Sequence, residues 1–370
     1  MIALKHTTGC LKKLLNFDNP DLSKSPKWKS LRGALRVYLD AFSQLIRRLV
    51  DTESRFMILQ HLYTITPVLT SFPRSTKPLI DRFIKIWAHY PKSAENSNDP
   101  DSINNKLRII AYLILNKLSN KQKGRLVLAE YIAKNMYKQF QRSIRQTSVH
   151  TLPVIDFLKR TLAEIFTSEL ILESGLAYKH AFLYIRNLAM TLRKAITTQK
   201  HLEVYNWNFV HSVQLWTGVV NKTSELEKLQ FPITQITIGA IRLDRNIKNV
   251  PFIYWMCGCL VNSVEKTRKM IPVHVMLFDM VLLVDRTVDD GLEKKLIVKM
   301  ARKSKKDEEE LNTHDMEKAW PCMLRFSKNE LKHEVVLGKF LADKFFILYS
   351  RYLKSQVNFK GVKKFSQFIY

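Results

Sequence analysis

A proline that recurs after an apolar residue constrains this chain most, as in Phe231-Pro232, Val250-Pro251 and Ile271-Pro272. Proline suits the first turn of a helix because its missing N–H would have no partner there, and the apolar residue before it packs onto that turn. Successive prolines lie about 20 positions apart, so a pair of helices repeats roughly every 40 residues, close to the roughly 40 to 47 of HEAT and armadillo units.

The stretch before these prolines has the spacing of an amphipathic helix. Its apolar residues recur three or four apart and predict a buried stripe of Tyr178, Phe182, Ile185, Ala189 and Leu192. Five short helices are therefore expected between Tyr178 and Asp285. The β-branched run from Ile233 to Ile238 also suits a strand, but we favour a helix because Pro232 precedes it.

Helical spacing extends back to Leu31, which predicts an all-α chain built as a HEAT/armadillo-like helical-repeat solenoid over residues 31–290. Residues 16–29 are rich in Pro, Ser, Asp and Lys, so residues 1–30 are expected to be an N-terminal tail or linker. Residues 291–318 hold a basic run followed by an acidic one, which is typical of a charged loop. Residues 319–370 are expected to form a C-terminal helical segment.

The charge of the chain favours a polyanionic partner. Sixty Lys and Arg residues against 33 Asp and Glu residues give a formal net charge of +27. Such an excess attracts nucleic acid through the summed potential and the release of counterions. The alternative is a basic surface that only keeps the protein solvated.

Catalytic and cofactor patterns are missing from the sequence. It has no glycine-rich phosphate loop and no His-Glu-x-x-His motif, and His180 and His211 lie beside apolar helix faces, where a structural role is expected. Four cysteines are too few for a disulfide framework, and Cys257 and Cys259 are expected to be core residues. No run reaches the roughly 18 apolar residues of a membrane span or resembles a signal peptide. We therefore expect a soluble intracellular binding protein with no catalytic residue, metal, cofactor or small-molecule substrate.

Two groups of residues are candidates for binding. Cations spaced along the predicted helices suit phosphates, and the RNA-binding candidates are Lys179, Arg186, Arg193, Lys194, Arg242, Arg245, Lys266, Arg268 and Lys269. A solvated face is the alternative for each of them. Aromatic residues are dense after position 204, and the candidates for a partner interface are Tyr205, Trp207, Phe209 and Trp216, with core packing as the alternative for Phe209 and Trp216.

Two ordered segments carry a family resemblance. The first is Tyr178-Lys-His-Ala-Phe-Leu-Tyr-Ile-Arg-Asn-Leu-Ala-Met-Thr-Leu-Arg193, followed by Val204-Tyr-Asn-Trp-Asn-Phe-Val-His211. The second is Phe231-Pro-Ile-Thr-Gln-Ile-Thr-Ile-Gly-Ala-Ile-Arg-Leu243, followed by Ile271-Pro272. In their order and spacing these segments resemble the nucleolar complex protein 2 family. The resemblance weakens in the C-terminal third, and Ile253, Gly258 and Asp244 depart from the family pattern.

The resemblance implies a helical-repeat factor of the nucleolus and nucleoplasm that helps to build the large ribosomal subunit. Its implied partners are the precursor particle with its ribosomal RNA and a homologue of nucleolar complex protein 1 or 3. A nuclear histone-binding transcriptional corepressor is the alternative within the family. A generic helical-repeat adaptor or transport protein is the alternative outside it, although receptors for basic cargo need acidic inner surfaces.

Overall fold

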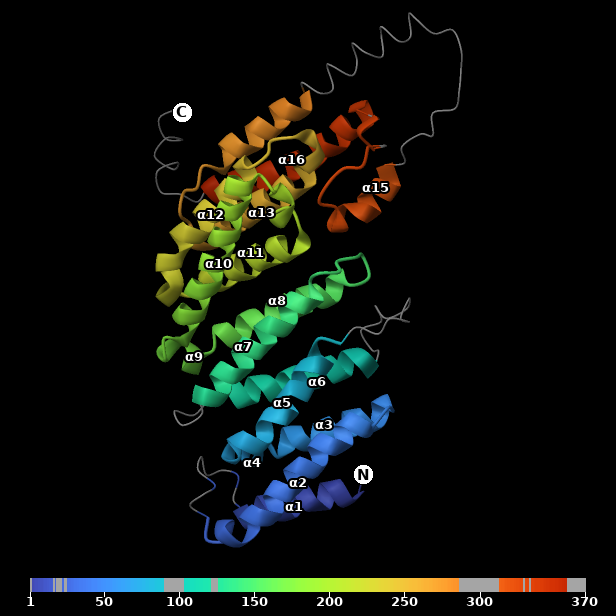
Figure 1. Cartoon of the computed structure of the whole chain (residues 1–370), viewed down its shortest axis with the longest axis vertical. Coiled ribbons are helices and arrows are strands. Elements are labelled where there is room, and N and C mark those ends of the chain that lie inside the picture. The colour runs from blue at the N-terminus through green and yellow to red at the C-terminus, as the bar shows by residue number, and fades with distance from the viewer. Residues whose placement is uncertain are drawn as a thin grey trace, which may run out of the picture. The chain divides into compact units, whose positions relative to one another are not determined.

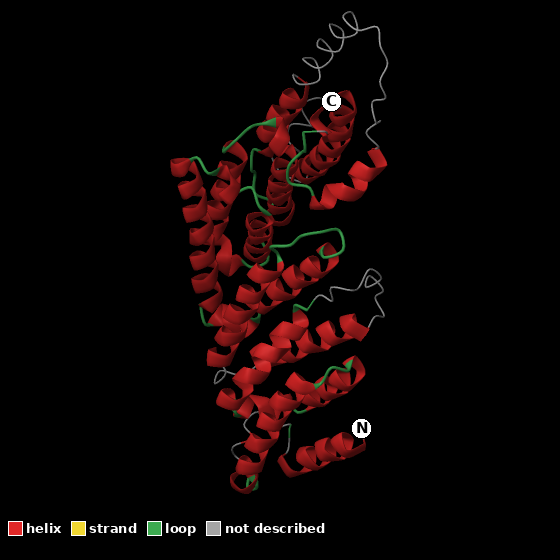
Figure 2. Ribbon diagram, turned by 45° about the vertical axis from the view of Figure 1, so that its right-hand side comes forward, coloured by secondary structure: helices red, strands yellow, loops and turns green. Residues whose placement is uncertain are grey.

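The computed structural model describes residues 2–15, 17, 22, 25–89, 103–120, 126–285, 313–328, 330–332 and 334–357. Within these residues every regular element is an α-helix or a 3-10 turn, and none is a strand (Figure 2). The all-α prediction is confirmed, and the HEAT/armadillo-like solenoid remains a prediction. No described helix combines the length and apolar character that crossing a bilayer requires. The chain divides into two compact units, residues 1–146 with 150–180 and residues 147–149 with 181–370.

Unit 1 consists of short helices that follow one another along the chain (Figure 1). They are α1 (Ile2–Leu15), α2 (Trp28–Arg48), α3 (Thr52–Thr64), α4 (Thr66–Ser71), α5 (Pro73–Trp87), α6 (Ile103–Ser119), α7 (Leu126–Ser143), α8 (Leu152–Phe166), α9 (Glu169–Glu173) and the first residues of α10 (Leu176–Thr198). Helices that are separated in sequence also pack together, α2 on α5 and α3 on α6. The core of this unit is therefore continuous across several helices.

Local chemistry sets the ends of these helices. Asp51 precedes α3, and its carboxylate accepts hydrogen bonds from the N–H groups of Glu53 (3.4 Å) and Ser54 (2.8 Å). These two groups have no partner within the helix, so the carboxylate replaces the missing carbonyls. Pro67 and Pro73 lie in the first turns of α4 and α5, where proline costs no hydrogen bond.

The structure corrects the prediction that residues 1–30 are a tail or linker. Residues 2–15 form α1, whose Leu11 and Leu15 are buried, and α2 already begins at Trp28. A polar contact ties α1 to the next two helices: the Nδ1 atom of His61 on α3 lies 2.9 Å from Thr8 Oγ1, and its Nε2 lies 2.7 Å from the hydroxyl of Tyr38 on α2. The sequence missed α1 because Lys5, Lys12 and Lys13 interrupt a short apolar pattern.

Unit 2 contains the five helices expected between positions 178 and 285. They are the rest of α10, α11 (Trp207–Val220), α12 (Gln230–Arg242), α13 (Val250–Thr267) and a helix at residues 273–285. The preference for a helix over a strand after Pro232 is confirmed by α12. All three prolines lie in the first turn of their helix or directly before it, as predicted.

Contacts between side chains give the directions of these helices. Gln230 at the start of α12 donates to Thr267 at the end of α13 (2.8 Å), so α12 and α13 are antiparallel. Asn221, at the end of α11, donates to Ser263 near the end of α13 (3.0 Å), so α11 and α13 run the same way. Three consecutive helices therefore alternate in direction.

The described residues from 313 to 357 fall in unit 2, and residues 358–370 of the predicted C-terminal segment lie outside the described part. Part of the predicted charged loop, residues 313–318, lies in α15 (Thr313–Ala319), while residues 291–312 lie outside the described part. Beyond α15, Trp320 is buried among the rings of Tyr254, Phe340 and Phe326. The last helix is α16 (Glu334–Val357), which packs on α13.

Backbone hydrogen bonds join the chain after Trp320 to the start of α13. The N–H of Phe252 donates to the carbonyl of Leu324 (3.2 Å), and the N–H of Phe326 donates to the carbonyl of Lys248 (2.9 Å). Trp255 adds a bond from its Nε1 to the carbonyl of Met323 (3.1 Å). Because the first N–H groups of a helix lack partners inside it, the carbonyl of Leu324 supplies an acceptor that the first turn of α13 needs.

Candidate nucleic-acid and partner interfaces

The nine predicted RNA-binding cations are all exposed: Lys179, Arg186, Arg193, Lys194, Arg242, Arg245, Lys266, Arg268 and Lys269. They lie on α10, at the C-terminal ends of α12 and α13, and in the turns that follow. A helix C-terminus favours a nearby cation because its last carbonyls point outward. Exposure agrees with binding and equally with a solvated face, so the neighbours of each cation decide between the two.

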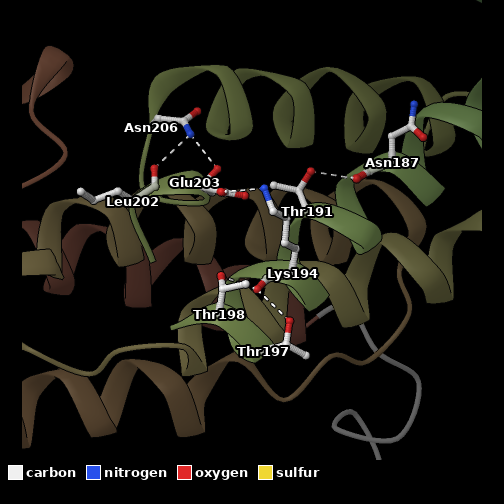
Figure 3. Close-up of polar contacts among 8 residues, drawn as sticks. All are labelled: Asn187, Thr191, Lys194, Thr197, Thr198, Leu202, Glu203 and Asn206. Carbon is white, nitrogen blue, oxygen red and sulfur yellow. Dashed lines mark hydrogen bonds and ion pairs between the residues drawn. The ribbon is translucent and has the colours of Figure 1, made fainter. Parts of the chain in front are cut away.

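Four of the nine cations already have a carboxylate partner. Lys179 lies 3.3 Å from Glu130, Lys194 lies 2.8 Å from Glu203, Arg245 lies 3.1 Å from Asp279, and Lys269 pairs with Glu227. Figure 3 shows the second of these pairs beside Asn206, whose amide donates to the carbonyls of Leu202 and Glu203 before α11. A paired cation gains less from a phosphate, because it must first give up its carboxylate.

Five cations have no such partner among the described residues: Arg186, Arg193, Arg242, Lys266 and Arg268. Arg268 follows the last residue of α13 in the left-handed conformation, with φ of 52°. Its backbone N–H closes the helix on the carbonyl of Val264 (2.9 Å), which leaves the guanidinium outside the helix end. These five are the strongest candidates for an external anion.

The predicted aromatic interface is wrong for three of its four residues. Tyr205, Phe209 and Trp216 are buried, at 4%, 3% and 0% exposure, and only Trp207 is half-buried. Trp216 stacks on Tyr184 with ring centroids 5.5 Å apart, and Tyr205 meets Phe252 edge-on at 4.5 Å. These rings fill the space between α10, α11 and α13, so the alternative of core packing holds for Phe209 and Trp216 and extends to Tyr205.

The two histidines are buried, as expected for structural residues. His211 lies 3.2 Å from both Thr147 Oγ1 and Gln214 Oε1, and Trp207 stacks on its ring. Burial lowers the pKa of His180, an effect that the carboxylate of Glu130 opposes. Burial also raises the pKa of Cys257 to about 12, with a smaller contribution from Cys259, so this core thiol stays protonated. Among the described residues no three His, Cys, Asp or Glu side chains lie close enough to hold a metal ion.

The buried stripe of α10 differs from the predicted one. Tyr178 and Phe182 are 41% and 50% exposed, and the residues that face the core of unit 2 are Ala181, Ile185, Leu188, Leu192 and Ala195. The small alanines allow close packing, and on α12 a Cβ at Gly239 would come within 2.9 Å of the side chain of Leu192. Larger rings on this side of α10 would hold the two helices apart.

An apolar groove that the sequence did not reveal lies between the helix at residues 273–285 and α16. The two helices are antiparallel, since His274 stacks near Tyr352 and Phe278 meets Tyr349. Toward the other end they enclose a cavity of about 490 Å³, lined by Leu277, Val281, Val284, Ala342, Phe345 and Phe346 among others. Phe346 is 73% exposed. The apolar runs on both helices were visible in the sequence, but their mutual distance was not.

Comparisons with known proteins agree with the resemblance noted in the sequence. A family model described as the Noc2p family matches residues 127–359. Nucleolar complex protein 2 of Drosophila melanogaster is 28% identical over 258 residues, which are 68% of this chain and 31% of the relative. Nucleolar complex-associated protein 2 of Arabidopsis thaliana is 27% identical over 292 residues, 75% of this chain and 36% of the relative.

A homologue of nucleolar complex protein 2 in Caenorhabditis elegans is 24% identical over 255 residues, 66% of this chain and 33% of the relative. The chain thus spans about a third of the length of the curated relatives that it matches. The matched region contains nearly all of α7 and the described helices that follow it, and with them the aromatic core and all nine candidate cations. Since the family model covers well over half of its residues, the chain belongs to the Noc2p family.

Proposed function

We propose that this chain is a non-enzymatic assembly factor for the large ribosomal subunit, which holds precursor ribosomal RNA and pairs with a homologue of nucleolar complex protein 1 or 3. The observation that carries the proposal is the set of exposed cations that have no acidic partner among the described residues, in a Noc2p family member whose net charge is +27. The names of its relatives, which are nucleolar complex proteins, support a place in the nucleolus, and we extend it to the nucleoplasm.

The RNA contact is proposed for the cations at the ends of α12 and α13. Because these helices are antiparallel, Arg242 lies at one end of the pair and Lys266 and Arg268 at the other. A helix of this length places the two groups about 20 Å apart, a span of several phosphates. Contacts of this kind hold and orient RNA without reading its bases, so sequence preference should be slight.

The pairing with a second protein is supported by the groove between residues 273–285 and α16. Its rim exposes Phe278, Val281 and Phe346 at 53%, 46% and 73%. Soluble proteins rarely leave a contiguous apolar patch of this kind in water unless it binds something. A helix of a partner that fills the groove would bury these side chains together.

Affinity purification of the tagged full chain, with RNA and proteins identified from the same sample, tests the whole proposal. We expect precursor RNA of the large subunit together with a sister nucleolar complex protein. Histones recovered without ribosomal RNA would instead favour the corepressor alternative. A sample with neither RNA nor a nucleolar complex protein would refute the assembly role.

Salt titration tests the cations. The variant Arg242→Gln, Lys266→Gln, Arg268→Asn removes three cations for which the described part of the chain holds no acidic partner, and asparagine suits the left-handed position. The matched variant Lys194→Gln, Arg245→Gln, Lys269→Gln removes three cations that are paired with carboxylates. The first variant should reduce the slope of log affinity for a structured RNA against log salt concentration by about 2 to 3, and the second variant should reduce this slope by clearly less. Equal flattening in both variants would show that the charge acts diffusely.

A further inference from the structure

The side of α10 that points away from the core of unit 2 carries three rows of residues, each with a spacing of seven. The middle row is Arg186 and Arg193, one flanking row is Phe182, Ala189 and Ile196, and the other is Leu183 and Met190. At 3.6 residues per turn the arginines project between the two apolar rows. We call these seven residues the α10 outer face.

The apolar residues of this face are exposed, apart from Ala189, which is half-buried. Leu183, Met190 and Ile196 are 46%, 58% and 55% exposed, whereas the buried stripe of the same helix lies on its opposite side and closes on α12 near Gly239. A single exposed apolar side chain is ordinary in a folded protein. Two apolar rows that keep one spacing over two helical turns are not ordinary, and they indicate a surface that another molecule covers.

The charge of the α10 outer face is unbalanced. Arg186 and Arg193 lie about 10 Å apart along the helix and form no ion pair with any residue that the structure describes. The neighbouring Lys194 points elsewhere, toward Glu203 on the turn before α11 (Figure 3). A molecule that covers this face must therefore supply two anionic groups at the same spacing, or it would bury two charges without partners.

We propose that the α10 outer face binds an amphipathic helix of a partner protein that carries carboxylates seven residues apart between two apolar rows. A spacing of seven on both helices keeps the contact aligned in a left-handed pair that crosses at about 20°. Each guanidinium can then bind a carboxylate through two parallel hydrogen bonds. This inference rests on the proposed pairing with a protein and deepens it by adding a second contact surface, besides the groove between residues 273–285 and α16, and by naming the chemistry of the partner.

RNA fits this face less well than a helix does. Strands of RNA are bound through phosphates, which prefer solvated cations, and through bases that stack on aromatic rings. Leu183, Met190 and Ile196 offer aliphatic surface, which gains from a dry apolar partner, and Phe182 is the one ring among the seven residues on which a base could stack. The ends of α12 and α13 lack this apolar frame, so the two surfaces are chemically distinct.

Site-specific cross-linking tests the proposal in cells that express the tagged full chain. Met190 is replaced by a photo-reactive phenylalanine, and the cross-linked peptide is identified by mass spectrometry. We expect a peptide of another protein with Asp or Glu at positions i and i+7 between apolar residues. Arg186→Glu with Arg193→Glu should lower the yield at least about tenfold, and changing the partner's two carboxylates to Lys should restore it.

The matched control is Lys222→Glu with Lys228→Glu, the same change of charge on exposed residues of unit 2 outside both proposed binding surfaces, which should leave the yield unchanged. Cross-links to RNA, to a second copy of this chain, or to a peptide without the paired carboxylates would each overturn the proposal. So would a yield no higher than that from the exposed position Glu225. If a partner co-purifies but does not cross-link at position 190, the pairing stands and the assignment of the α10 outer face is wrong.

Discussion

Truncation of Trp216 tests how unit 2 is held together. The indole is fully buried and stacks on Tyr184 of α10, with an interplanar angle of 23°. A buried indole removes roughly 200 Å² from water, which at about 25 cal/mol per Å² is worth about 5 kcal/mol. Trp216→Ala should therefore lower the free energy of unfolding by about 3 to 5 kcal/mol, because the neighbours can fill only part of the cavity.

Two units need not unfold in one step, so a global denaturation curve alone would not assign the loss. Hydrogen exchange of peptides from α10 and α11 measures it locally, with peptides from α5 and α6 of unit 1 as an internal reference. Trp207→Ala is the matched control, since that ring is half-buried and should cost only about 1 to 2 kcal/mol. A loss below about 1 kcal/mol for Trp216→Ala, or equal losses for both variants, would refute the argument from burial.

Two other side chains give sharp expectations. Burial lowers the pKa of His61 below its ordinary value of about 6.5, so its stabilisation of unit 1 is present above pH 6.5 and is lost as the pH falls through the lowered value. Thermal unfolding between pH 7.5 and 5 should show this loss as a falling melting temperature. His61→Gln should weaken the pH dependence of the melting temperature without abolishing it, because burial also lowers the pKa values of His89 and His180. A pH dependence equal to the parent's would contradict the assignment to His61. Trp320→Ala should lower the free energy of unfolding by about 3 to 5 kcal/mol and raise the hydrogen exchange of amides at the start of α13. Protection there equal to the parent's would show that the segment after Trp320 does not stabilise this end of the helix.

Periodicity and proline placement were enough to predict the five helices between positions 178 and 285, because both are local properties of the chain, whereas α1 and α15 were missed. The direction in which a helix faces was harder to predict. On α10 the aromatic Tyr178 and Phe182 were assigned to the core, but the core side carries Ala181 and Ala195, since α12 approaches closely at Gly239. Which of two apolar stripes is buried depends on the size of the facing residues, and a single sequence does not show which residues face each other.

For the candidate site, the exposure of the cations could be predicted from the sequence, but their contacts could not. Charge and spacing identified nine cations that are indeed exposed, but their partners are distant in sequence, as Glu130 is from Lys179 and Glu227 from Lys269. The dense aromatic residues were mistaken for a surface because the rings that cover them lie on other helices, Tyr184 against Trp216 and Phe252 against Tyr205, and no pattern in the sequence relates these positions. The spacing of seven on α10 was visible for the cations, and the same spacing in the adjacent apolar rows would have indicated the outer face.

The bonds between α13 and the segment after Trp320 have a consequence for synthesis. Trp255 and Met323 are 68 residues apart, and a chain that emerges from the ribosome from its N-terminus has Trp255 available long before Met323. Until then the first turn of α13 lacks its backbone partners and Tyr254 and Trp255 lack the ring of Trp320. All residues of unit 1 have emerged at that stage, whereas unit 2 still lacks its C-terminal residues and leaves apolar surface exposed to contact with other chains. The nascent protein is therefore expected to need a chaperone most after Trp255 and before Met323 has been synthesised. This need should be smallest once Phe326 has emerged.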